Sequence, residues 1–189
     1  MRPVSSAAEF VPDAARSRRF EQRVLPHLAA AYGLARWLTR AEHDAEDVLQ
    51  EAMLRAYRYY DGRDDGNVHA WLLAIVRNTF YTLYRQTAAA RQEEFDEAIH
   101  DSADNAPSPE AQLLQEADAQ RVRAAIERLP VEYREVLVLR EFEECSYKDI
   151  AEITGLKIGT VMSRLARARD RLARHLGADA QGEAHAALQ

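Results

Sequence analysis

The segment from Gly159 to Leu176 has two chemically different faces, and this division constrains the fold more than any other feature. Apolar side chains recur on one stripe at helical spacing: Val161, Leu165, Ala168, Leu172 and Leu176. Hydroxyl and basic side chains take the other stripe: Thr160, Ser163, Arg164, Arg167, Arg171 and Arg174. The pattern predicts a long amphipathic helix that packs on a core with one side and carries positive charge on the other.

A short helix and a tight turn are expected to precede this long helix. Ser146 can cap a helix that runs to Ile153, and Asp149 falls near its positive end. Gly155 suits the left-handed conformation that ends a helix. The layout predicts a helix-turn-helix that reads duplex DNA through the major groove. The candidate duplex contacts are Lys157, Thr160, Ser163, Arg164, Arg167 and Arg171. Which arginines meet bases and which meet phosphates stays open.

Residues 20–87 are also expected to be helical, with a loop at 61–67. The helix after that loop has a predicted apolar side of Trp71, Leu72, Ile75, Val76, Thr79, Phe80 and Leu83. Its other side carries cations, an amide and a tyrosine: Arg77, Asn78, Tyr81, Thr82 and Arg85. Cations follow a phosphate backbone and aromatic rings stack on unpaired bases, so this side favours a single strand. The alternative is a solvated helix face.

The stretch 44–58 predicts another amphipathic helix, with acids early and arginines late. Four residues lie away from its apolar stripe: Asp47, Gln50, Glu51 and Leu54. An exposed leucine beside acids and an amide is a candidate protein-binding patch. An ordinary amphipathic helix is the alternative.

Charge divides the chain into parts. Residues 88–118 carry nine acids and one arginine, a net charge of −8, whereas residues 1–87 and 119–189 each carry +1. We therefore expect an all-α protein of two small helical domains, 20–87 and 119–176, joined by a flexible acidic linker at 88–118. An N-terminal extension (1–19) and a C-terminal tail (177–189) complete the chain. The linker is a tether, or it also shields the basic helix from stray DNA.

The sequence gives little support for a metalloprotein, an enzyme or a membrane protein. Cys145 is the single cysteine and the six histidines are scattered, so we expect no metal and no cofactor. No nucleophile–base constellation or glycine-rich phosphate loop appears, which argues against an enzyme and a small-molecule substrate. No apolar run approaches the roughly 20 residues that span a bilayer. We expect a cytoplasmic protein.

Several motifs resemble those of a known family. Asp44-Ala-Glu-Asp-Val-Leu-Gln-Glu and Trp71-Leu-Leu-Ala-Ile-Val-Arg-Asn are similar to region two of the extracytoplasmic-function (group four) bacterial sigma factors of the sigma-70 family. Leu129-Pro-Val-Glu-Tyr-Arg-Glu-Val-Leu, Ser146-Tyr-Lys-Asp-Ile-Ala-Glu and Gly159-Thr-Val-Met-Ser-Arg-Leu are similar to region four. Two positions depart from the usual pattern: Lys157, where proline is common, and Met162, where lysine is common.

The resemblance implies a transcription initiation factor with two partners, core RNA polymerase and promoter DNA. Region two would bind the polymerase clamp helices through Asp47, Gln50, Glu51 and Leu54. It would also hold the minus-ten strand through Asn67, Val68, His69, Arg77, Asn78, Tyr81, Thr82 and Arg85. Region four would read the minus-thirty-five duplex and rest on the polymerase flap. An anti-sigma factor is a further implied partner, and a membrane-bound one could hold the protein at the inner membrane.

The main rival is a helix-turn-helix regulator that does not dock on polymerase. This function explains residues 146–176, but it does not explain the residue patterns at 44–58 and 71–85.

Overall fold

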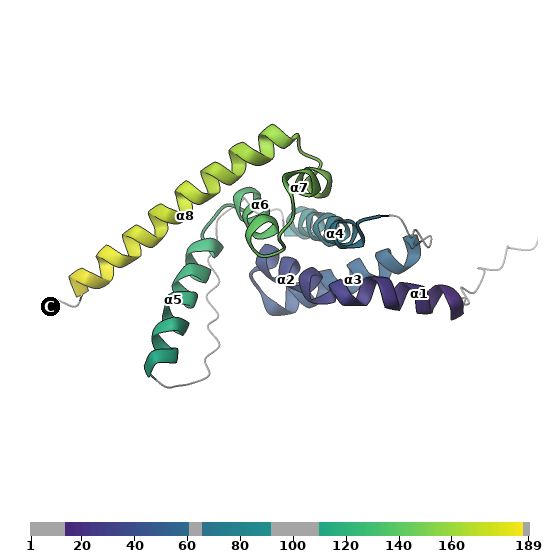
Figure 1. Cartoon of the computed structure of the whole chain (residues 1–189), viewed down its shortest axis with the longest axis horizontal. Coiled ribbons are helices and arrows are strands. Elements are labelled where there is room, and N and C mark those ends of the chain that lie inside the picture. The colour runs from purple at the N-terminus through teal and green to yellow at the C-terminus, as the bar shows by residue number, and fades with distance from the viewer. Residues whose placement is uncertain (1–13, 61–65, 92–109, 187–189) are drawn as a thin grey trace, which may run out of the picture.

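The structure, a computed structural model, describes residues 14–60, 66–91 and 110–186. These residues form helices and no strand, which confirms the all-α prediction (Figure 1). The elements in chain order are α1 (Ala14–Val24), a 3-10 turn η1 (Leu25–His27), α2 (Leu28–Thr39), α3 (Glu42–Tyr59), α4 (Val68–Arg91), α5 (Glu110–Glu127), α6 (Val131–Glu141), α7 (Tyr147–Thr154) and α8 (Ile158–Ala186).

The first group of helices is built on the three-way packing of α2, α3 and α4. Their apolar stripes meet in a core that buries Leu34 and Leu38 of α2 and Val48 of α3 completely or nearly so. Leu72 and Val76 of α4 complete it, as the helical periodicity of that segment predicts. The chain between α1 and α2 is not one continuous helix, because Pro26 lacks an amide hydrogen and its ring disrupts the ladder there.

The second group contains α5 to α8, and α8 is the long diagonal helix of Figure 1. Val161, Leu165 and Ala168 of α8 are buried, and Leu172 and Leu176 are half-buried, so the predicted apolar stripe is confirmed. The helix is longer than expected at its far end and runs to Ala186. Helix α5 packs alongside it.

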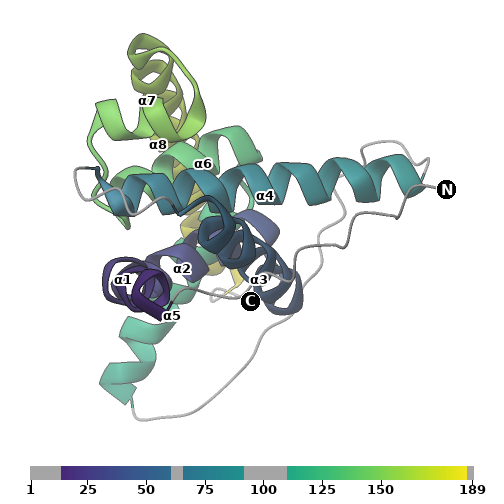
Figure 2. The same ribbon diagram turned by 90° about the vertical axis from the view of Figure 1, so that its right-hand side faces the viewer.

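The two groups pack against each other directly. Helix α6 lies on α2, and α7 lies on α4, so the buried side chains of both groups form one continuous core. Figure 2 shows α4 between the helices α6 and α7 on one side and α2 and α3 on the other. The expected linker contains helical residues at both ends, because α4 runs to Arg91 and α5 begins at Glu110. Residues 92–109, including the acids Glu93, Glu94, Asp96 and Glu97, lie outside the described residues.

A buried arginine joins the groups. The guanidinium of Arg134 on α6 donates to the carbonyls of Glu127 at 2.7 Å, Leu129 at 3.0 Å and Leu38 at 3.3 Å. Two of these carbonyls belong to helix ends, where unpaired oxygens favour a cation. Burial, with a contribution from nearby Arg40, lowers the pKa of Arg134 to about 10. Arg40 adds a second link, donating to the Glu127 carbonyl at 3.1 Å.

Candidate nucleic-acid interface

The α4 face, defined as Arg77, Asn78, Tyr81, Thr82 and Arg85, lies opposite the buried stripe of the same helix. Asn78 and Arg85 are exposed, while the other three members are half-buried. The guanidinium of Arg77 lies 4.6 Å from the centre of the Tyr81 ring. A cation is thus held over an aromatic ring within the protein. That this face binds a single strand stays a prediction.

Glu135 of α6 binds both Arg77 and Tyr81. Its Oε1 accepts from Nε of Arg77 at 2.9 Å, and its Oε2 accepts from the hydroxyl of Tyr81 at 2.6 Å. The Glu135 side chain is fully buried, whereas 18% of the Arg77 side chain is exposed. Burial and the carboxylate of Glu135 raise the pKa of Tyr81, so its hydroxyl stays a donor. A buried charge is tolerable only when paired and hydrogen-bonded, and Glu135 meets both conditions.

The residues beside the predicted loop are also engaged. Oδ1 of Asn67 accepts from the amide of Ala70 at 3.1 Å, which caps the start of α4. Its Nδ2 donates to Asp149 of α7 at 3.1 Å. Nε2 of His69 lies 3.5 Å from Oε2 of Glu143. Burial raises the pKa of Glu143, although the interaction with His69 acts in the opposite direction. Val68 is half-buried. Residues 61–65 of this loop lie outside the described residues.

The helix-turn-helix has the local geometry that its sequence predicts. The hydroxyl of Ser146 accepts from the amide of Asp149 at 3.1 Å, and the Asp149 carboxylate accepts in return from the Ser146 amide at 3.0 Å. These reciprocal bonds form a capping box at the start of α7. The Ser146 hydroxyl also donates to Oδ2 of Asp149 at 2.6 Å, and this bond is the largest cause of the lowered pKa of Asp149. Gly155 follows α7 with φ of 70°, a conformation that glycine adopts without strain.

The α8 face, defined as Lys157, Thr160, Ser163, Arg164, Arg167 and Arg171, starts at this turn. Lys157, Ser163 and Arg167 are exposed and the others are half-buried. Arg171 lies 4.8 Å from the centre of the Tyr133 ring. Arg169 lies on a different side of the helix and forms an ion pair with Glu141 of α6 at 2.7 Å.

The two faces meet in one cavity of about 560 Å³. All five residues of the α4 face line it, together with Glu132, Leu156 and Arg164. Arg164 is thus shared between the cavity and the α8 face. Among the described residues, no group of three or more His, Cys, Asp or Glu side chains could hold a metal ion.

The α3 patch, defined as Asp47, Gln50, Glu51 and Leu54, lies away from both faces. Asp47, Gln50 and Leu54 are exposed, and Leu54 shows 60% of its surface to solvent. Glu51 accepts from Nε of Arg55 at 2.7 Å. The exposed leucine thus lies on the side of α3 that faces away from the core.

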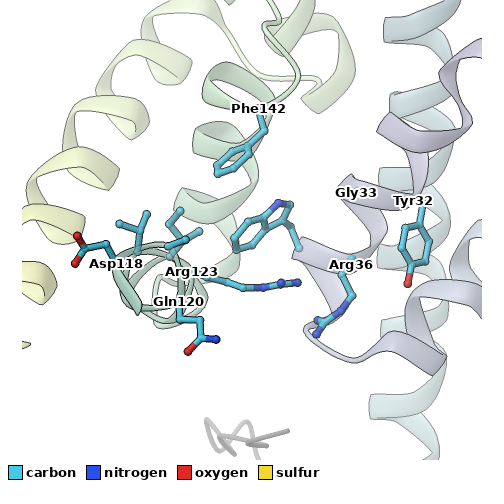
Figure 3. A pocket seen from close by; sticks show the side chains of 11 residues that line it. Tyr32, Gly33, Arg36, Asp118, Gln120, Arg123 and Phe142 are labelled. Carbon is cyan, nitrogen blue, oxygen red and sulfur yellow. The ribbon is translucent and has the colours of Figure 1, made fainter. Parts of the chain in front are cut away.

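An apolar groove of about 710 Å³ lies between α2 and α5, with Phe142 also lining it (Figure 3). Trp37 and Phe142 form its floor, with ring centres 5.2 Å apart. Arg123 reaches from α5 toward α2, and its guanidinium lies 5.6 Å from the centre of the Trp37 ring. Phe142 directly follows the last residue of α6 and is half exposed.

Comparison with known proteins decides the family. Residues 24–90 match the family model for Sigma-70 region 2, and residues 119–172 match the one for Sigma-70, region 4. The RNA polymerase sigma-H factor of Pseudomonas aeruginosa is 35% identical over 162 residues, which are 81% of this chain and 83% of that protein. The ECF RNA polymerase sigma factor SigE of Mycolicibacterium smegmatis is 33% identical over 89% of this chain and 67% of that protein.

The chain belongs to the ECF family of RNA polymerase sigma factors. This sigma factor is therefore a transcription initiation factor and not an enzyme, as its motifs predict. The rival prediction, a regulator that does not act with polymerase, fails because both sigma regions match.

Solved structures agree with this assignment. The sigma factor RpoE from Bartonella quintana, in complex with the anti-sigma factor NepR, matches with a TM-score of 0.70 and 31% identity. That match covers 86% of this chain and 99% of the other. CnrH in complex with the cytosolic domain of CnrY matches with a TM-score of 0.61 and 30% identity, over 86% and 90% of the two chains.

Sequence reasoning missed Glu135. Its neighbours Val136 and Leu137 are apolar and buried, and an acid directly before such a run is the signal that could have pointed to a buried ion pair.

Proposed function

We propose that this sigma factor divides promoter recognition between the α4 face and the α8 face. The α4 face, with Asn67, Val68 and His69, receives the unpaired minus-ten strand. The α8 face reads the minus-thirty-five duplex. The observation that carries this division is the Arg77–Tyr81 pair beside the exposed amide of Asn78. A base stacked on an aromatic ring contributes about 1–3 kcal/mol, which offsets the cost of leaving the duplex.

Promoter binding then requires the two groups of helices to separate. Glu135 of α6 binds Arg77 and Tyr81. Asp149 of α7 contacts Asn67, and Glu143, between α6 and α7, contacts His69. This part of the chain thus covers residues that we propose for the minus-ten strand. We propose that the described arrangement is the resting form. Core polymerase would favour the separated form by binding the α3 patch on one group and α5–α8 through its flap on the other.

We also propose control by an anti-sigma factor, in the cytoplasm or at the inner membrane. Support comes from RpoE, which was solved with the anti-sigma factor NepR, and from CnrH, which was solved with the cytosolic domain of CnrY. The apolar groove between α2 and α5 is a suitable binding site for a helix of the anti-sigma factor, because such a helix would contact both groups and hold them together.

A binding experiment tests the division of roles. Core polymerase carrying this sigma factor should hold a fluorescent minus-ten single strand more tightly than the matching duplex. Asn78→Ala and Tyr81→Ala should reduce that binding in a sequence-dependent way, while Thr39→Ala, on α2 outside the α4 face, should leave it unchanged. Equal affinity for both strand forms, insensitive to the first two substitutions, would remove the single-strand role from α4.

A further inference from the structure

Two large apolar side chains are exposed at the start of α8. Ile158 shows 47% and Met162 shows 52% of its surface to solvent. They are four residues apart, so they lie on the same side of the helix, one turn from each other. Val161 and Leu165, in the same two turns, are 0% and 1% exposed. The helix therefore contributes to the core without Ile158 and Met162.

The surroundings of this pair are polar and basic. Lys157 and Ser163 flank it and are both exposed. Residues 154–176 carry six Lys and Arg and one acid, a local charge of +5. Single exposed apolar residues are common and need no explanation, but this pair sits at the start of the second helix of a helix-turn-helix. In that motif the first turns of the second helix reach the base edges.

The glycine between them leaves room for a close approach. Gly159 is exposed, and a Cβ added to it would have no atom within 4 Å. Packing inside the protein therefore does not require a glycine at this position. A helix that lacks a side chain here can lie deeper in a groove.

We propose that Ile158 and Met162 read the C5-methyl groups of thymines in the minus-thirty-five duplex. The thymine methyl is the apolar feature that the major groove offers, and apolar side chains are its partners. The local +5 charge complements a DNA polyanion, which makes duplex DNA the occupant of this surface rather than an apolar protein helix. The inference rests on the proposed function, in which α8 enters the groove, and adds which base the first two turns select.

Removal of a single methyl group tests the inference. The full-length sigma factor with core polymerase is first used to select promoter fragments from a random library. Each thymine of the upstream element is then replaced by deoxyuridine, one strand at a time, which removes only the methyl. Binding should weaken about fourfold at one or two positions, equivalent to about 0.8 kcal/mol for one buried methyl.

Variants connect that loss to the named residues. Met162→Ser should bind the thymine and deoxyuridine fragments with similar affinity at one of those positions, and Met162→Leu should keep the difference. Leu25→Ser is the matched control, because Leu25 is 46% exposed but lies in the other group of helices. It should behave like the parent.

Several outcomes would overturn the inference while leaving the proposed function in place: a selected element without thymine, indifference of the parent to deoxyuridine, or an unchanged difference in Met162→Ser. A Met162→Ser variant that loses affinity for core polymerase without DNA would assign the pair to a protein contact and also overturn it. Failure of the parent to bind any duplex upstream element would instead overturn the proposed role of α8, and the inference with it.

Discussion

Glu135 on α6 accepts a hydrogen bond of 2.6 Å from the hydroxyl of Tyr81 on α4, although 54 residues separate the two in the chain. The same carboxylate binds Arg77 at 2.9 Å. A single buried acid thus holds the two side chains that are best suited to a phosphate and an unpaired base. If the α4 face receives promoter DNA, Glu135 competes with that DNA for the same groups.

Neutralising Glu135 should loosen this contact. Glu135→Gln keeps an acceptor for Tyr81 but removes the negative charge beside Arg77, and hydrogen bonds to charged groups contribute about 1.5–3 kcal/mol. We expect weaker energy transfer between fluorescent labels on α1 and α8, and tighter binding of free protein to single-stranded DNA. Glu141→Gln, which breaks an exposed pair with Arg169 inside one group of helices, should change neither. Unaltered transfer in Glu135→Gln would mean that the carboxylate does not hold the groups together.

The capping box of α7 should make stability depend on pH in the acid range. Hydrogen bonds from Ser146 lower the pKa of Asp149 in the folded protein below its ordinary value of about 3.9. The stabilisation is therefore fully present above that value and is lost as the pH falls through the lower folded pKa. Urea unfolding between pH 2 and 6 should show a smaller acid loss in Asp149→Asn than in the parent. Parallel curves for the two proteins would contradict this.

Arg164 should contribute to duplex recognition. It lies on the α8 face at the edge of the shared cavity, and a bidentate arginine–base contact discriminates by about 1–3 kcal/mol. Arg164→Ala in the polymerase complex should weaken binding to the upstream element by roughly tenfold or more at fixed salt. Arg18→Ala removes the same charge from an exposed position on α1 and should have little effect. Equal losses in both variants would indicate general electrostatics instead of a specific contact.

The α3 patch should be needed for polymerase binding. Asp47→Arg reverses an exposed charge, and Leu54→Asp places a charge on an exposed leucine of the helix. Both should reduce co-purification with core polymerase while leaving circular dichroism unchanged, because neither side chain belongs to the core. Glu21→Arg, on an exposed position of α1, is the control. Undiminished co-purification of both variants would place the docking site elsewhere.

Local features could be predicted from the sequence because they depend on residues near one another. Ser146, Asp149 and Gly155 lie within ten positions, and the capping box and left-handed turn follow from their chemistry. The buried side of α4 follows in the same way from the spacing of Leu72, Val76 and Phe80.

Features that depend on packing between distant segments could not be predicted. The burial of Glu135 requires α6 to lie on the α4 face, and nothing in the order of residues states that two helical groups remain in contact. Asn67 shows a second limit. Its side chain is predicted to contact the minus-ten strand, and the sequence does not indicate that its Oδ1 also caps α4 or that its Nδ2 also donates to Asp149.

Run-off transcription with core polymerase on a promoter library tests whether this sigma factor recognises two promoter elements through the separate α4 and α8 faces. We expect transcripts that start downstream of a shared pair of promoter elements. Asn78→Ala should shift the preferred downstream element and Arg164→Ala the preferred upstream one, each without altering the other. Transcription no more specific than that of core polymerase alone, or two variants that alter both elements alike, would contradict it.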